Sequence, residues 1–231
     1  MEQSDTGGGS RSVERALRIL SEVAATEGGM TLSTASRAVD LPTSTVARLL
    51  RTLETAGFLV REPSGVYQAG PKILQIGAIA VGNLALYNLA EEHLLDLSEY
   101  TGETAYLAVP DGPETAVYLR QVESPRAIRH AMWTGRAIRT SGTAVGAALA
   151  GRVGAEGFVL SRGTAIEPEA AAAAAPVTDA RGMVVGALSI IGPSFRIAED
   201  DLRRFGERTR DQADALSRSL RLLPQSGLRV G

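Results

Sequence analysis

The sequence predicts an α+β fold in two parts, a small helical module ending in a β-hairpin and a larger mixed α/β module. Three observations support this prediction. Apolar residues recur at helical spacing in short stretches between residues 12 and 56. Two runs of β-forming residues then flank a Pro-Ser-Gly turn at 63–65. Beyond residue 100, strand patterns alternate with turns and helical stretches, and a chain of 231 residues is long enough for two compact domains.

Three helices are expected in the first module. The first covers 12–26, with Ser12 as its N-cap and an expected apolar face of Val13, Leu17, Leu20 and Ala24. A short second helix is expected over 31–39. A turn ending at Pro42 separates it from a third helix over 43–56, which Gly57 stops. The runs around the Pro-Ser-Gly turn then form the hairpin.

The second module begins with a helical stretch from Pro71 to about Tyr100, which has a weak point near Gly82. Strands are expected over 101–112, 114–124, 127–135 and 182–192, and a short helix of small residues over 141–151. The alanine-rich stretch 167–176 is compatible with a helix or a loop. A terminal helix from Ala198 to about Leu222 has an expected apolar face of Leu202, Phe205, Thr209, Ala213, Leu216 and Leu220.

Composition changes near residues 72–80 divide the chain. The expected parts are a disordered Gly/Ser-rich tail over 1–11, a DNA-binding module over 12–72, linker and dimerisation helices over 73–100, and a second domain over 101–225. The chain opens without an apolar run, and no stretch has the ~20 apolar residues that a membrane crossing needs. A cytoplasmic protein with no membrane partner is therefore expected.

Several kinds of chemistry are excluded or unsupported. The absence of cysteine excludes disulfides, thiolate zinc sites and cysteine nucleophiles. The two histidines, His93 on a helix and His130 in an expected strand, lie in no nucleophile motif, so core or surface roles are expected. No phosphate-binding loop or dinucleotide fingerprint is found. We expect no catalytic residue, no metal site and no cofactor, with Glu167 and Glu169 as isolated solvated acids.

The third helix carries the functional signal. At ~100° per residue, Val46, Leu49, Leu50 and Leu53 share one face, and Ser44, Arg48, Arg51 and Thr55 lie opposite. One arginine side chain can form two hydrogen bonds with the edge of a guanine in the major groove. Hydroxyl groups can form hydrogen bonds with bases or phosphates. The helix N-terminus offers amides to a phosphate. The expected DNA-binding residues are Thr43, Ser44, Thr45, Arg48, Arg51, Thr52, Arg61 on the wing, and Lys72.

Charge favours this interpretation only weakly. Residues 32–72 carry a net charge of +2, whereas the whole chain carries −2. One such module would neutralise few phosphates and bind DNA weakly. Specific binding would therefore need two modules, in a dimer that contacts two half-sites about one helical turn apart. The alternative is a helix-turn-helix shape that contacts another protein.

Three stretches resemble the N-terminal domain of IclR-type bacterial transcription regulators: "SVERALRILSEVA", "LPTSTVARLLRTLETAGFLVRE" and "YQAGPKILQIG". "APVTDARGMVVGALSIIGPSFRI" resembles the end of that family's effector-binding domain. The resemblance covers nearly the whole chain. It implies a winged helix-turn-helix, a linker helix and a GAF-like α/β domain, assembled as a homodimer or a dimer of dimers. It also implies repression of transcription from operator DNA, modulated by a small carboxylate or aromatic effector.

The second half departs from the family pattern. Ser141 and Ala147 stand where histidine and lysine are common, and the segment between Leu149 and Gly163 is short. A smaller or more open effector pocket is therefore expected. The candidate effector-binding residues, by alignment with pocket-forming motifs, are Ser141, Gly142, Thr143, Ala144 and Ser189. Two alternatives stay open: the small residues serve only helix–sheet packing, and the domain only assembles subunits without a ligand.

Overall fold

The computed structural model describes residues 10–222, except 83, 131 and 164–166. The chain forms two compact units, Met1–Ala80 and Val81–Gly231. Most of the predicted N-terminal tail, residues 1–9, lies outside the described residues, as do 223–225 at the end of the predicted second domain. The remainder of that predicted tail is described, and Arg11 already belongs to the first helix.

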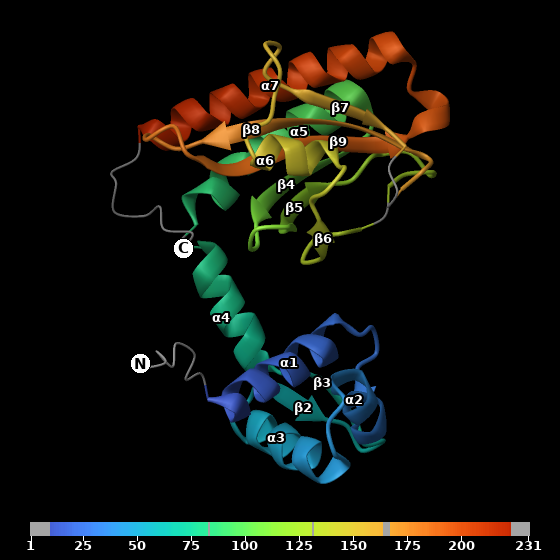
Figure 1. Cartoon of the computed structure of the whole chain (residues 1–231), viewed down its shortest axis with the longest axis vertical. Helices are drawn as coiled ribbons and strands as arrows, with labels where there is room; N and C mark the ends of the chain where they lie inside the picture. The colour runs from blue at the N-terminus through green and yellow to red at the C-terminus, as the bar shows by residue number, and fades with distance from the viewer. Residues whose placement is uncertain (1–9, 83, 131, 164–166, 223–231) are drawn as a thin grey trace, which may run out of the picture. The chain divides into compact units, whose positions relative to one another are not determined.

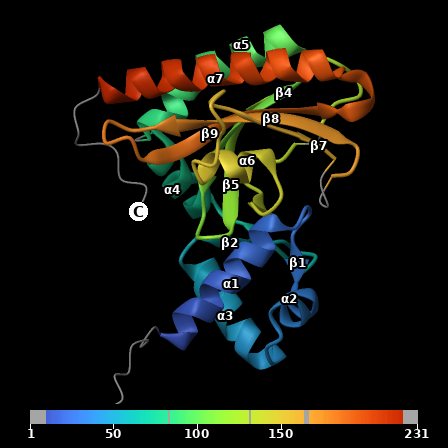
Figure 2. The ribbon, with the colours of Figure 1, turned by 45° about the horizontal axis from the view of Figure 1, so that its top comes forward.

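The first unit is a winged helix-turn-helix, as predicted. Its elements are α1 (Arg11–Ala25), β1 (Met30–Thr31), α2 (Leu32–Val39), α3 (Thr43–Thr55), β2 (Leu59–Arg61), β3 (Val66–Ala69) and most of α4 (Pro71–Gly82). The strands pair antiparallel in the order β1-β3-β2, so the hairpin is confirmed and β1 adds a strand that the sequence did not indicate. Figure 2 shows the three helices gathered beside this small sheet.

The turn between α2 and α3 has a simple local cause. Asp40 ends α2 in the left-handed conformation, at φ 52°, which aspartate tolerates better than most residues. Pro42 follows as the N-cap of α3, and its fixed φ suits the entry to a helix. At the start of α2, the hydroxyl of Thr31 accepts a hydrogen bond from the amide of Thr34. These contacts set the angle at which α3 leaves the turn.

The apolar face predicted for α3 is confirmed, whereas that predicted for α1 is wrong. The buried residues of the first unit are Ile19, Val23, Ala35, Val39, Val46, Leu49, Leu50, Leu53, Leu59 and Tyr67. In α1, Val13 and Leu17 are instead 56% and 55% exposed. The N-cap is Ser10 and not Ser12. Since α1 carries apolar residues on two faces, spacing alone could not decide which face is buried.

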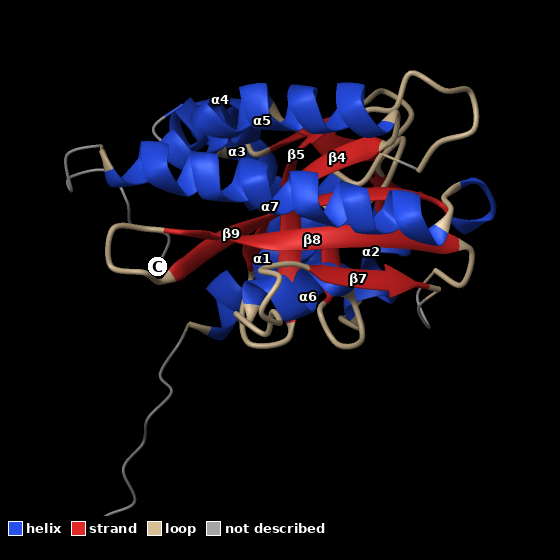
Figure 3. Ribbon diagram, turned by 90° about the horizontal axis from the view of Figure 1, so that it is seen from above, coloured by secondary structure: helices blue, strands red, loops and turns tan. Residues whose placement is uncertain are grey.

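The second unit is one six-stranded antiparallel sheet with helices on both faces (Figure 1). The strand order is β6-β5-β4-β9-β8-β7. The elements are α5 (Ala85–Thr101), β4 (Thr104–Pro110), β5 (Thr115–Val122), β6 (Ala137–Arg139), α6 (Ala144–Leu149), β7 (Val159–Arg162), β8 (Ala170–Thr178), β9 (Val184–Pro193), the 3-10 turn η1 (Ser194–Arg196) and α7 (Glu199–Arg221). Figure 3 shows α5 and α7 running along the same face.

Alternate residues of the central strands build two separate cores. On β4, Ala105, Leu107 and Val109 face the core beneath α5 and α7, whereas Tyr106 and Ala108 face the core beside α6. Strands β8 and β9 divide their residues in the same way. This follows from the period of two along a strand, which sends successive side chains to opposite faces. The central strands are therefore apolar on both sides.

Three secondary-structure predictions need correction. The alanine-rich stretch 167–176, expected as helix or loop, supplies most of strand β8. It is a strand because pairing with β7 and β9 on both sides outweighs the helix preference of alanine. The expected strand over 127–135 is absent from the described residues of that range, which form bends and turns. Strands β6 and β7 were not predicted. The break near Gly82 is confirmed, since α4 ends there.

No single helix among the described residues is both long enough and apolar enough to cross a membrane; α4 and α5 reach those limits only when taken together. Helix α4 has no buried residue within the described structure. Its large exposed apolar residues are Leu74, Ile76 and Ile79, of which Ile76 and Ile79 lie on one side of the helix and Leu74 on another.

Truncating Leu50 tests the core assignment of α3. Leu50 is fully buried, so Leu50→Ala leaves a cavity and should lower the free energy of unfolding by about 2–5 kcal/mol. Urea unfolding of the full chain, followed by circular dichroism, measures this loss. The control is Thr55→Ala on the exposed side of the same helix, which should change stability by no more than about 0.5 kcal/mol. Equal losses in the two variants would contradict the assignment.

Candidate functional site

The outer face of α3 is a polar surface open to solvent. Thr43, Ser44, Arg48, Arg51 and Thr52 are exposed, and Thr45 is half-buried. The structure thus brings together the six candidates that the sequence placed on this helix. The N-cap residue is Pro42, which has no polar side chain to bond the first-turn amides. The amide of Thr45 donates to the carbonyl of Pro42 at 2.9 Å, whereas those of Thr43 and Ser44 can bond an external acceptor.

The two arginines of this face are available for an external partner. Among the residues that the structure describes, neither Arg48 nor Arg51 forms an ion pair or a side-chain hydrogen bond. Thr52 donates its hydroxyl hydrogen to the carbonyl of Arg48, at 3.1 Å, which leaves the oxygen of Thr52 as an acceptor. The two exposed guanidinium groups lie opposite the buried side of α3, so they can donate hydrogen bonds to acceptors on another molecule.

The wing supplies two more candidate cations. Arg61 ends β2, and its guanidinium carbon lies 5.6 Å from the centre of the Tyr67 ring, a cation–π distance. The Lys72 ammonium donates to the amide oxygen of Gln75 at 3.0 Å, within the first turn of α4. Both side chains are exposed. Both are thus held by weak contacts that a phosphate could replace.

A small cavity lies on the α6 side of the second unit. Its volume is about 40 Å³, room for only a few water molecules. It is lined by Tyr118, Trp133, Ile138, Thr143, Ala144, Val145, Ser161, Glu167, Ala170, Ala172, Ser189 and Ile191. Three predicted effector-binding residues, Thr143, Ala144 and Ser189, line it. Ser141 lines a different, open groove instead, and Gly142 is exposed and lines neither.

The two hydroxyl groups among these candidates differ. Thr143 caps α6: its oxygen accepts from the amide of Gly146 at 3.0 Å, and its hydroxyl donates to the carbonyl of Thr140 at 2.9 Å. The close approach of Thr140 to Gly146 leaves no room for a side chain at that position. Ser189 is 1% exposed, and its oxygen has no hydrogen-bond partner of normal geometry among the described residues. Thr143 is therefore engaged in capping α6, whereas Ser189 is not.

A polar chain that the sequence did not predict borders this cavity. The Tyr106 hydroxyl lies 2.5 Å from Nδ1 of His130, and Nε2 of His130 lies 2.7 Å from Oε1 of Glu167. Because a carboxylate only accepts, Nε2–H donates to Glu167; when the ring is neutral, Nδ1 then accepts from the phenol. Trp133 packs edge-on against the imidazole, with ring centres 4.7 Å apart. Three separate segments therefore meet at His130.

Two expectations are corrected at this point. His130 lies in a loop and not in a strand, and Glu167 is paired and not isolated. Spacing along the sequence could not reveal the pair, because its members are 37 residues apart on different elements. The other histidine, His93, is buried on α5 as expected, with Nδ1 2.6 Å from the side-chain oxygen of Gln212 on α7.

Burial keeps the tyrosines of this region neutral. Burial raises the pKa of Tyr106 far above its usual value, and the neighbouring Tyr118 and Glu167 raise it further. Burial likewise raises the pKa of Tyr118, with an added contribution from Glu167, while Ser189 has a small opposing effect. Both phenols therefore keep their protons and act as hydrogen-bonding groups.

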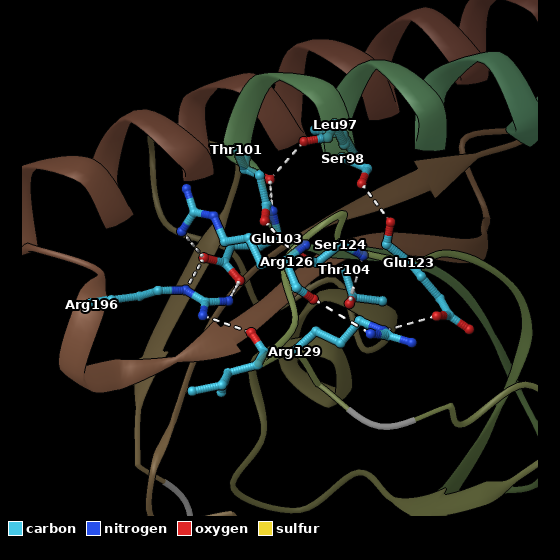
Figure 4. A network of polar contacts seen from close by, with 12 residues as sticks. Leu97, Ser98, Thr101, Glu103, Thr104, Glu123, Ser124, Arg126, Arg129 and Arg196 are labelled. Carbon is cyan, nitrogen blue, oxygen red and sulfur yellow. Dashed lines mark hydrogen bonds and ion pairs between the residues drawn. The ribbon is translucent and has the colours of Figure 1, made fainter.

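A buried carboxylate holds the loop that carries His130 (Figure 4). The Glu103 side chain is 1% exposed and accepts hydrogen bonds from Arg196, at 2.7 and 2.5 Å, and from Arg126, at 3.1 Å. Arg196 also donates to the carbonyl of Ile128 at 2.7 Å. The hydrogen bond to Glu103 raises the pKa of Arg196. Arg196 is therefore engaged with a buried acid, and is neither free for a ligand nor part of a surface bridge.

The described residues contain no group of three or more His, Cys, Asp or Glu side chains arranged to hold a metal ion.

Two family models match the chain. The model of the IclR helix-turn-helix domain matches residues 12–63. The model of the bacterial transcriptional regulator IclR C-terminal domain matches residues 78–156 and 152–218. These two segments meet between α6 and β7, within the segment that the sequence analysis found to be short.

Curated relatives span nearly the whole chain. The HTH-type transcriptional regulator XynR of Escherichia coli strain K12 is 28% identical over 245 residues, covering 91% of this chain and 97% of that protein. The HTH-type transcriptional repressor AllR of the same strain is 27% identical over 249 residues, covering 93% and 92%. The matching families and relatives are transcriptional regulators and not enzymes.

Solved structures share the fold. The IclR transcriptional regulator from Alicyclobacillus acidocaldarius matches with a TM-score of 0.77 at 23% identity, covering 91% of this chain and 98% of that one. Pseudomonas aeruginosa HmgR matches with a TM-score of 0.72 at 25% identity, covering 92% and 100%. Since the two family models cover most of the chain and lie in both of its units, the protein belongs to the IclR family of bacterial transcriptional regulators.

Proposed function

We propose that this protein is a repressor that binds operator DNA as a homodimer and responds to a small organic effector. The observation that carries the DNA-binding part is the outer face of α3, where Arg48 and Arg51 are exposed and unpaired among the described residues. The repressor AllR is a relative over nearly the whole chain, which supports repression as the sign of control. Because operator DNA is cytoplasmic in bacteria, the protein would act there.

Contacts on DNA follow from the geometry of α3 and the wing. Arg48 and Arg51 would bond base edges in the major groove, with Ser44, Thr45 and Thr52 beside them. Thr43 and the first-turn amides would meet a phosphate. Arg61 and Lys72 would contact the flanking backbone, which positions the module without selecting sequence. Residues 12–72 would form the DNA-binding part, 73–100 the linker and 101–225 the effector domain.

The exposed apolar faces of the first unit support a dimer. Val13 and Leu17 on α1, and Leu74, Ile76 and Ile79 on α4, are large apolar residues that nothing in the described chain covers. Covering such residues by a second copy removes apolar area from water. Two copies would then present two reading helices to two half-sites. Such dimers could associate further, as a dimer of dimers.

The cavity of the second unit is the proposed effector site. Thr143, Ala144 and Ser189 line it, together with Glu167, which contacts His130. An effector can change DNA affinity only if it binds the DNA-competent and DNA-free forms with different affinities. Rearrangement of the contacts around His130 would supply that difference.

Removing one arginine from α3 tests the DNA-binding proposal. Arg48→Ala and Arg51→Ala should each lower affinity for the DNA upstream of the protein's own gene by about 1–3 kcal/mol, or roughly 5- to 150-fold. Fluorescence anisotropy at fixed salt measures this. Arg181→Ala, an exposed arginine of the second unit, is the matched control and should change nothing. Unchanged binding in both α3 variants, or no binding by the parent protein at low salt, would refute the proposal and favour a protein-contact role.

Arg61 should behave as a phosphate contact. Arg61→Ala should weaken binding to operator and to unrelated DNA by the same factor, and should reduce the slope of log affinity against log salt by about 1. Titrations of both DNAs at several salt concentrations measure the slope. Arg61→Lys keeps the charge and should retain the slope. A selective loss on the operator alone would instead assign Arg61 to base recognition.

Charges on the exposed apolar residues of one side of α4 should separate the subunits. The double variant Ile76→Asp, Ile79→Asp, at positions three residues apart on that side, places like charges in the proposed interface and should convert dimers into monomers at micromolar concentration. Analytical ultracentrifugation measures the mass. Met183→Asp, at an exposed apolar residue of the β8–β9 turn, is the control and should stay dimeric. A parent protein that is monomeric at every concentration, or a double variant that stays dimeric, would count against this interface.

A further inference from the structure

The wing, formed by β2, β3 and the turn between them, has a tip that is fixed by backbone hydrogen bonds. The amide of Gly65 donates to the carbonyl of Glu62 at 2.9 Å, and the amide of Glu62 donates to the carbonyl of Val66 at 2.8 Å. Pro63 has a fixed φ that suits the second position of such a turn. Gly65 adopts a φ of 87°, which a side chain would strain. The backbone of the turn therefore has one preferred course.

The side chain of Glu62 bridges this turn. Its Oε1 accepts a hydrogen bond from the side-chain amide of Gln68 on β3, at 2.7 Å, and its Oε2 accepts one from the hydroxyl of Ser64, at 3.1 Å. The oxygen of Ser64 accepts from the amide of Val66, at 3.4 Å. One carboxylate thus ties the end of β2 to the turn and to the opposite strand. Because Glu62 is exposed, its charge also acts on molecules outside the protein.

The wing carries two opposite charges that do not pair with each other. Residues 59–70 contain one cation, Arg61, and one acid, Glu62. No ion pair joins these two side chains in the described part of the chain. A side chain added at Gly65 would begin 3.7 Å from the guanidinium of Arg61, and the carboxylate of Glu62 lies against Ser64. Both charged groups therefore end beside the same turn, and their charges sum to zero.

The charge of Glu62 opposes the contact proposed for Arg61. A phosphate bound by Arg61 would be repelled by the nearby carboxylate, over a range set by the Debye length. This length is ~8 Å at physiological ionic strength and ~30 Å at about 0.01 M salt. Since phosphates line every duplex, the repulsion acts on operator and unrelated DNA alike. At low salt it should offset part of the attraction that Arg61 supplies.

The hydrogen bonds of the same carboxylate favour binding. A turn that is already ordered loses less conformational freedom on binding than a turn that DNA must order. Arg61 is the last residue of β2 and directly precedes the turn. A fixed turn therefore holds the backbone of Arg61 in place for a phosphate contact. The charge and the hydrogen bonds of Glu62 thus have opposite effects on affinity.

We propose that Glu62 is a positioning residue of the wing, whose hydrogen bonds hold the turn beside Arg61 and whose charge lowers the affinity for all DNA. The proposal rests on the wing contacting DNA, as proposed above. Spacing along the chain does not single out Glu62, because its contact with Gln68 crosses the hairpin.

Glu62→Gln tests the role of the charge. The variant is neutral and keeps an oxygen that can accept from Gln68. At low salt it should bind the DNA upstream of the protein's own gene, and an unrelated duplex, roughly two- to tenfold more tightly than the parent does. The gain should shrink as salt rises. Fluorescence anisotropy of the full chain measures both. Glu99→Gln, at an exposed acid of α5, is the control and should change nothing. Unchanged or weaker binding by Glu62→Gln at low salt would overturn the role of the charge.

Glu62→Ala and Gln68→Met test the role of the hydrogen bonds. Glu62→Ala removes the charge and the hydrogen bonds together, so it should bind both duplexes several-fold more weakly than Glu62→Gln at the same salt. Gln68→Met keeps the charge and removes a donor, so it should bind several-fold more weakly than the parent. In the free protein, hydrogen exchange at the amides of Gly65 and Val66 should be faster in both variants, and that of Glu62→Gln should match the parent. Equal DNA affinity of Glu62→Ala and Glu62→Gln would overturn the positioning role.

Failure of this proposal and failure of the DNA-binding proposal give different results. If Arg48→Ala and Arg51→Ala lose operator affinity while all Glu62 variants bind as the parent does, the role of Glu62 is refuted and recognition by α3 stands. If the Glu62 variants behave as expected while both α3 variants bind as the parent does, the wing contacts DNA and recognition by α3 is refuted. A parent protein that binds neither duplex at low salt overturns both.

Discussion

The DNA-binding half of this protein depends on how α3 is rotated about its own axis. Val46, Leu49, Leu50 and Leu53 are buried together on one side, and each fully buried side chain of this kind contributes about 1.5–3 kcal/mol. Turning the helix by one residue, or ~100°, would expose part of this face. It would also bring an arginine toward a core in which the described residues offer it no carboxylate partner, at a cost of several kcal/mol. Burial and charge therefore select the same orientation, with Arg48 and Arg51 outward.

The second unit uses the two faces of its sheet differently. The face under α5 and α7 is closed by two long helices and is filled by aliphatic residues. The opposite face is covered by α6, which spans only Ala144–Leu149, and the chain then reaches β7 directly through residues 150–158. Aromatic side chains and the loop carrying His130 occupy part of this second face. This face is therefore covered by a single short helix and by loops, and the small cavity lies there.

Two acidic side chains of this unit have different surroundings. Glu103 is fully buried and receives hydrogen bonds from two arginines, so its charge is compensated. Glu167 is partly exposed, contacts His130 and lines the cavity. The two are linked, because Arg196 bonds both Glu103 and the backbone of Ile128, two residues before His130. The buried bridge thus positions the loop that carries His130, which contacts Glu167.

The sequence by itself determined the winged helix-turn-helix, the buried face of α3, the break near Gly82 and the terminal helix, because each depends on periodicity and turn residues within a few neighbours. It also placed Ser44, Arg48 and Arg51 opposite the buried face, and all three are exposed. It did not determine which side of α1 is buried, since two apolar faces have the same period and only packing chooses between them. Strand β8 and the contacts among Tyr106, His130 and Glu167 were decided by tertiary structure alone. Alanine becomes a strand residue there because β7 and β9 pair with it on both sides, and the polar chain joins residues that only the folded sheet brings within hydrogen-bond distance.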